Sequence, residues 1–133
     1  PRSDLFLSPD HAVYVDGVLI PIKHLINRTT IARMPIDTIV YYHIELPSHD
    51  ILLAEGMPAE SWLDTGDRAC FDNFGCIAAP HRAMPGHERV ARICEAIGYA
   101  PLIVAGPRLH AVRRIVDDRA ASIWHGQPAE ALA

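Results

Sequence analysis

The chain has 133 residues, of which 50% are hydrophobic and 21% are charged, and its formal net charge is −4. This length and balance predict a single folded domain and argue against a disordered chain. The net acidity, the lack of a basic stripe and the lack of an apolar run of about 20 residues argue against nucleic-acid binding and against a membrane helix.

The first part of the chain predicts β structure, beginning with three short strands. Residues 4–7 and 12–15 are rich in β-favouring side chains, and residues 18–20 form the returning strand of a hairpin. The Asp16-Gly17 pair between the last two runs is a strong signal for a two-residue turn.

The next stretch predicts one helical turn and three further strands. The turn is expected over residues 23–26, and the strands over residues 29–32, 37–46 and 50–54. Gly56 and Pro58 are expected to close the last of these strands. Turn signals at intervals of about 8–12 residues favour an all-β unit over an α/β one.

Helical patterns replace the β patterns after Thr65. Apolar residues at helical spacing predict a helix over residues 86–97. The Gly106-Pro107 pair predicts the start of a second helix, which runs toward Ile123.

These patterns predict a mainly β fold in two parts. A compact all-β unit is expected over residues 1–66, and a small α-containing C-terminal extension over residues 67–133, packed on the β unit or following it. An odd number of cysteines without short paired spacing fits neither a disulfide framework nor a zinc site; they are Cys70, Cys76 and Cys94. A bridge between the first two stays open, and the sequence indicates neither a compartment nor an oligomeric state.

The stretch Ser8-Pro9-Asp10-His11 places a hydroxyl and an imidazole three positions apart, at a bend between two predicted strands. Pro9 fixes its own φ and favours an extended Ser8, which predicts a rigid turn. Imidazole titrates near neutral pH, so a histidine held in this way could donate a proton to a leaving amine and then take one back. The alternative is a serine-proline turn whose histidine only satisfies local backbone groups.

Several further stretches, in order along the first half of the chain, strengthen the first interpretation. Together with the Ser8–His11 box they resemble the hedgehog/intein (Hint) domain family, in particular bacterial Hint-domain proteins. The stretches are residues 2–17, 19–21, 25–27, 42–46, 49–56 and 61–66. The resemblance implies an all-β Hint-like unit, which is incomplete in this sequence.

The resemblance also implies that the domain rearranges a peptide bond of its own polypeptide, in the manner of inteins and hedgehog proteins. In the family, a cysteine or serine attacks the preceding carbonyl, and the histidine of a Thr-x-x-His or Ser-x-x-His box protonates the amide nitrogen. His11 matches that histidine and Ser8 matches the hydroxyl residue. We therefore expect His11 to be the general acid/base and Ser8 to orient it or the scissile carbonyl. No cofactor is implied.

A second box, residues 49–52, resembles the late histidine motif of inteins. By this resemblance His49 could act as a proton shuttle and Asp50 could activate the incoming nucleophile. The alternative for His49 is a surface turn. His43 and Glu45 share one face of a predicted strand and are expected to be structural.

Two departures from the family pattern limit the expected activity. Glu60 stands where a splicing intein has its cyclising asparagine, so complete splicing is not expected, although Ser61 could serve as a downstream nucleophile. The nucleophilic cysteine of the family's opening segment has no match in this sequence. We therefore expect the C-terminal part of a Hint domain, inactive by itself, whose partner and substrate is its own upstream polypeptide.

Two alternatives come from other classes of protein. A histidine-based metal site could take its ligands from His11, His43, His49 and Asp50, although their spacings match no known zinc box. An inert β-rich structural or interaction module that has lost the chemistry is the other alternative.

Overall fold

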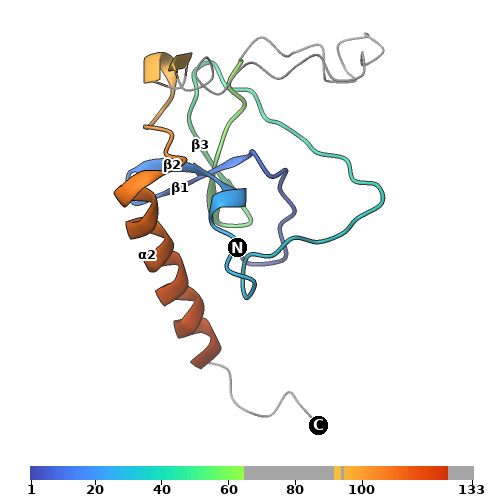
Figure 1. Ribbon diagram of the computed structural model, residues 1–133. Helices are drawn as coiled ribbons and strands as arrows, with labels where there is room; N and C mark the ends of the chain where they lie inside the picture. Colours follow the sequence, from blue (N-terminus) through green and yellow to red (C-terminus); the bar gives the residue numbers. More distant parts are fainter. Residues whose placement is uncertain (65–91, 94, 126–133) are drawn as a thin grey trace.

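The computed structural model describes residues 1–64, 92–93 and 95–125 (Figure 1). Strands β1 (Ala12–Val15), β2 (Val18–Pro21), β3 (Ile51–Ala54) and β4 (Met57–Glu60) form one antiparallel sheet in the order β2-β1-β4-β3. A short 3-10 helix, η1 (Ile22–His24), follows β2, and the long helix α2 (Gly106–His125) lies near the end of the chain. The mainly β fold with a helical extension is therefore confirmed.

The β1–β2 hairpin forms where the Asp-Gly pair predicts it. Asp16 and Gly17 both have positive φ, 51° and 82°, as a type I′ turn requires at its two central positions. The flanking pair Val15–Val18 closes the turn. The predicted strands at 12–15 and 18–20 are thus confirmed, and the predicted helical turn at 23–26 forms as the neighbouring η1.

The β3–β4 hairpin contains a strand that the sequence did not predict. Glu55 and Gly56 repeat the positive φ values, 50° and 79°, so Gly56 turns the chain instead of ending the β structure. Pro58 lies inside β4, opposite Leu53. Because hydrogen-bonded and non-hydrogen-bonded pairs alternate, and Ala54–Met57 closes the turn, the missing proline N–H removes no bond to β3.

The core lies between the β1–β2 hairpin and the first turns of α2. Val13 and Ile20 from the sheet pack with Leu109 and Val112 from the helix, and all four are at least 96% buried. Figure 1 shows α2 starting beside the hairpin and running away from it. The predicted second helix is therefore confirmed, and its apolar face is what attaches it to the sheet.

Polar contacts support this attachment. The Arg108 guanidinium lies 3.0 Å from the Asp16 carboxylate and also donates to the Asp16 carbonyl. Arg113 Nε donates to the carbonyl of His24 over 2.6 Å. Residues 101–103 run parallel to β2, with hydrogen bonds on both sides of Leu19.

Three predicted strands, at residues 4–7, 29–32 and 37–46, are absent from the described residues. At 29–32 the Asn27 side chain accepts the backbone N–H groups of Thr29, Thr30 and Ile31, which curls the chain locally. Such an Asx-type turn competes with strand formation.

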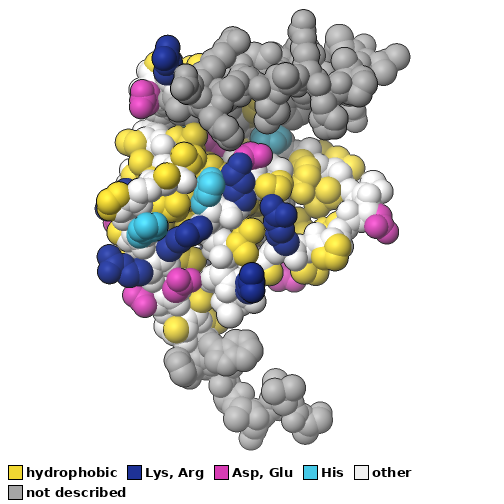
Figure 2. All heavy atoms as spheres, viewed as in Figure 1, with side chains coloured by type: hydrophobic (Ala, Val, Ile, Leu, Met, Phe, Trp, Pro, Cys, Tyr) yellow, Lys and Arg dark blue, Asp and Glu magenta, His cyan; other side chains and the backbone are white. Residues whose placement is uncertain are grey.

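The segment 37–46 runs through a wide loop instead of forming a strand (Figure 1). Within the described residues, a backbone hydrogen bond from the Trp62 N–H to the Ile44 carbonyl connects it to the segment that follows β4. Figure 2 shows apolar side chains on the surface of this part of the molecule. The exposed large side chains between residues 34 and 44 are Met34, Ile36, Val40, Tyr41, Tyr42 and Ile44.

Two expectations fall mainly outside the described part of the chain. Residues 92–93 and 95–97 are helical, and the rest of the predicted helix 86–97 lies outside the described residues, as do all three cysteines. Among the helices that the structure describes, none has both the length and the apolar character needed to cross a membrane.

Candidate functional site

His11 is fixed at the entrance of β1 by backbone hydrogen bonds on both sides. Its N–H donates to the Ser8 carbonyl over 3.0 Å, which closes the turn through Pro9 and Asp10. Its own carbonyl accepts the N–H of Ile22 over 2.9 Å. The rigid turn expected from the Ser-Pro-Asp-His stretch is therefore present, and it directs a half-buried imidazole to one end of the sheet.

Glu60 is the last residue of β4 and lies at the same end of the sheet. The pairing of Val13 with Ala59 places Glu60 beside Ala12. Glu60 Oε1 accepts the Ala12 N–H over 2.7 Å, and the carboxylate side chain is only 19% exposed. A charge-assisted bond to an almost buried amide fixes the position of this carboxylate next to His11.

The surroundings of His11 lower its pKa below the ordinary value of 6.5. Burial of the ring is the main cause, because it disfavours the imidazolium form. The Glu60 carboxylate and the Glu60 backbone act in the opposite direction and raise the pKa, whereas His43 lowers it further. The His43 ring lies 5.2 Å from that of His11, centroid to centroid. The lowered pKa leaves His11 mainly neutral at pH 7, which is the form that accepts a proton.

His49 lies near the other carboxylate oxygen of Glu60. Its side chain is 1% exposed, and its Nδ1 accepts the backbone N–H of Tyr99 over 3.0 Å. Its Nε2 lies 3.6 Å from Glu60 Oε2, which is within ion-pair range but longer than a hydrogen bond. Nε2 is therefore buried without a hydrogen-bond partner among the residues that the structure describes. The two histidines and the carboxylate between them form what we call the His11–Glu60–His49 cluster.

One of three comparisons with known proteins agrees with the sequence resemblance. The model of the Hint domain family matches residues 1–66. Residues 1–66 belong to the Hint domain family. No curated protein and no solved structure matches the chain.

The structure brings two of the four predicted site residues of this Hint domain together. His11 and His49 both lie next to Glu60. Ser8 and Asp50 instead make hydrogen bonds to backbone N–H groups. Ser8 supplies its carbonyl to the His11 turn. Asp50 is exposed, and its Oδ1 accepts the N–H of Ile51 over 2.7 Å at the start of β3. The catalytic roles of all four remain predictions.

In the structure, Glu60 and Ser61 make contacts that the sequence did not predict. In the sequence, Glu60 stands out only as the replacement of an asparagine. Had residues 57–60 been predicted as a strand paired with residues 12–15, Glu60 could have been predicted to lie near residue 12. Ser61 is 1% exposed, and its Oγ accepts the N–H of Asp50 over 2.9 Å. Ser61 therefore aligns β3 with β4 and is poorly placed to act as a nucleophile.

The metal-site alternative finds no support in the part of the chain that the structure describes. No group of three or more His, Cys, Asp or Glu side chains there has an arrangement that could hold a metal ion.

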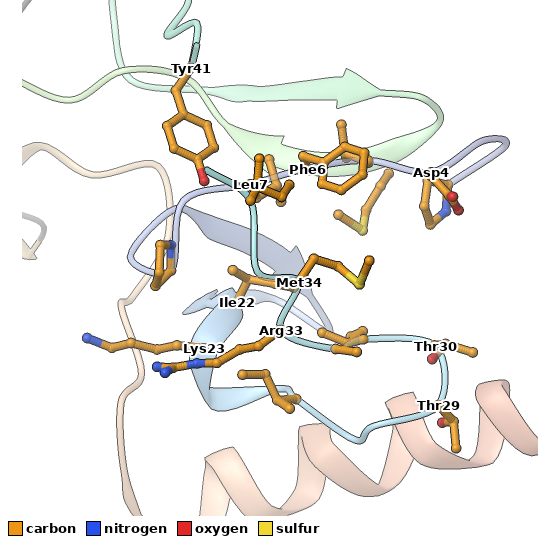
Figure 3. A pocket seen from close by; sticks show the side chains of 18 residues that line it. Asp4, Phe6, Leu7, Ile22, Lys23, Thr29, Thr30, Arg33, Met34 and Tyr41 are labelled. Atoms are coloured by element: carbon orange, nitrogen blue, oxygen red, sulfur yellow. The ribbon is translucent and has the colours of Figure 1, made fainter. Parts of the chain in front are cut away.

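A cavity of about 450 Å³ lies apart from the cluster, between the N-terminal segment and the loop that follows η1. Figure 3 shows Phe6 and Leu7 on one side of it and Met34 on the other, and Lys23 and Arg33 also line it. None of the three cluster residues lines this cavity. The candidate acid/base groups are therefore outside this cavity.

Proposed function

We propose that this Hint domain rearranges a peptide bond in its own polypeptide through an N–S or N–O acyl shift, with His11 moving the proton. The observation that carries the proposal is the half-buried His11, whose pKa is lowered and which lies beside the fixed Glu60 carboxylate. A neutral imidazole next to a carboxylate can take up a proton and be stabilised in its charged form. Membership of the Hint family supplies the reaction class.

The proton and the acyl group move in a balanced sequence. A thiol or hydroxyl group attacks the carbonyl carbon of the scissile amide and gives its proton to the neutral His11. The C–N bond of the tetrahedral intermediate then breaks, and the imidazolium returns the proton to the departing nitrogen. The product is a thioester or ester in place of the amide, and His11 is neutral again.

We further propose that the scissile bond lies in the polypeptide upstream of the Hint domain, and that only this bond is cleaved. The Glu60 carboxylate is already bound by the Ala12 N–H, and its side chain is one methylene too long to form the succinimide that an asparagine forms. The buried Ser61 hydroxyl is occupied by a backbone N–H. Both features argue against release of the downstream side, and hence against complete splicing.

The test is expression of the complete gene product that contains this chain, followed by intact-mass measurement with and without hydroxylamine, which intercepts an ester or thioester. Wild type is expected to be cleaved at one bond, slowly when water hydrolyses the ester or thioester to a carboxylic acid and faster when hydroxylamine takes the acyl group as a hydroxamate. His11→Ala should be cleaved at least about 100-fold more slowly, the usual effect of losing a general acid/base. His110→Ala is the matched control, because that histidine is exposed on α2.

Two results would overturn the proposal. The first is a His11→Ala variant that is cleaved at the wild-type rate. The second is a wild-type gene product that is folded, by circular dichroism, and yet is not cleaved under either condition. The second result would favour the inert interaction module.

A further inference from the structure

We propose that the segment around Tyr99, which lies outside the matched Hint region, completes the site by fixing the tautomer of His49. The inference extends the proposed function, on which it rests for its catalytic meaning. It assigns Tyr99 as a positioning residue that acts through its backbone N–H and not through its phenol.

The hydrogen bond at His49 Nδ1 determines which ring nitrogen carries the proton. A backbone N–H can only donate, so the nitrogen that accepts it, 3.0 Å away, carries no proton. The single ring proton of the neutral imidazole must then lie on Nε2. The side chain is 1% exposed, so water does not compete for either nitrogen.

The Nε2–H group of this tautomer faces Glu60. Nε2 lies 3.6 Å from Glu60 Oε2, so this tautomer presents a positive N–H dipole to the carboxylate. The other tautomer would present a nitrogen lone pair to the same negative charge in a buried environment, which is unfavourable. The N–H of residue 99 therefore selects the ring state that attracts Glu60. A small closure would convert this contact into a hydrogen bond and satisfy the buried Nε2 atom.

The segment that contains Tyr99 is held against the sheet by two sets of contacts. The Tyr99 ring packs edge-on against that of Tyr14 in β1, with centroids 5.7 Å apart. Residues 101–103 are hydrogen-bonded to Leu19 at the edge of β2, over 2.9 Å and 2.8 Å. Both contacts attach the segment to the same hairpin that begins at His11. The donor at residue 99 is thus held in place by the sheet that carries the rest of the site.

The consequence is a connected arrangement from the extension to His11. Tyr99 fixes His49, His49 faces one oxygen of Glu60, and the Ala12 N–H holds the other oxygen. Glu60 is in turn the carboxylate that favours protonation of His11. The C-terminal extension is therefore a component of the site as well as a packing element.

Nitrogen NMR of the whole ¹⁵N-labelled chain tests the inference directly. In wild type, His49 should show the Nε2–H tautomer and a scalar coupling across the hydrogen bond between Tyr99 N and His49 Nδ1. Tyr99→Pro removes the N–H donor and should abolish the coupling and produce a mixture of tautomers. Tyr99→Ala keeps the N–H and should retain both wild-type signatures, which separates the backbone role from the ring.

The outcomes are decisive even if the proline variant does not fold, because the wild-type spectrum alone can refute the inference. A proton on Nδ1 of His49 in wild type would overturn it, as would a folded Tyr99→Pro variant with unchanged His49 resonances. The tautomer is measured without any cleavage. A confirmed tautomer in a protein that never cleaves would therefore refute the proposed function and leave the positioning role of Tyr99 intact.

Discussion

Substitutions of Glu60 should separate its structural role from its electrostatic one. Glu60 Oε1 accepts the N–H of Ala12, which is 1% exposed, over 2.7 Å. In Glu60→Ala this buried N–H loses its partner and water cannot reach it. Loss of a charge-assisted bond to a buried donor costs about 2 kcal/mol, which corresponds to roughly a 30-fold fall in the folding equilibrium constant.

Glu60→Gln offers an amide oxygen of nearly the same shape and should lose less than half as much stability. Removal of the negative charge should nevertheless lower the pKa of His11 further, because the carboxylate raises it in wild type. Urea unfolding measures the stability, and NMR titration of the His11 ring measures the pKa. Equal stability of Glu60→Ala and wild type would refute the structural part of this reasoning, and an unchanged or raised His11 pKa in Glu60→Gln would refute the electrostatic part.

Three further predictions concern pH, packing and association. The pKa of His11 in the folded state lies below the ordinary value of 6.5, so between these two pH values the unfolded chain binds more protons and stability should fall as pH decreases. His11→Asn should flatten this part of a plot of urea midpoint against pH. An unaltered slope would contradict this linkage. Val112→Ala, at a fully buried site, should lower the unfolding free energy by about 2 kcal/mol. Arg114→Ala, at an exposed site on the same helix, should change it by less than about 0.5 kcal/mol. Similar values for the two variants would refute the packing of α2 on the sheet. The exposed apolar side chains of residues 37–46 should promote self-association. Replacing both Tyr42 and Ile44, which are 86% and 58% exposed, by serine should therefore reduce the mass measured by light scattering. An identical mass would argue against association through this surface.

The hairpin and the long helix could be predicted because their signals are local. Asp16 and Gly17 adopt the positive φ values that an Asp-Gly pair tolerates best, and the flanking apolar runs pair directly across the turn. In α2, the spacing of Leu109 and Val112 identifies the buried face directly. Neither inference needed knowledge of the rest of the fold.

The errors in strand assignment arise from competing local and long-range effects. Residues 29–32 have strand-like composition, but the Asn27 side chain captures three backbone N–H groups there. Residues 37–46 have the right alternation, but a strand exists only where another strand accepts its hydrogen bonds. β4 was missed for the opposite reason: Pro58 argues against a strand, yet it occupies a pair position at which no bond to β3 is lost.

The candidate site was predicted only in part, because its assembly depends on register. The Ser-x-x-His box gave His11, and the second box gave His49. Their meeting point, Glu60, follows from the pairing of β4 with β1, which no local pattern encodes. The contribution of Tyr99 depends on a contact between residues 50 positions apart and had no signal in the sequence.

The claim that His11 moves the proton is tested most directly by the pH dependence of self-cleavage in the complete gene product, compared with the NMR titration of His11 in the same protein. If His11 moves the proton, the cleavage rate falls with decreasing pH around a midpoint below 6.5 that coincides with the titration of His11. In Glu60→Gln both midpoints shift downward together. A cleavage rate that stays constant while His11 titrates would contradict the claim.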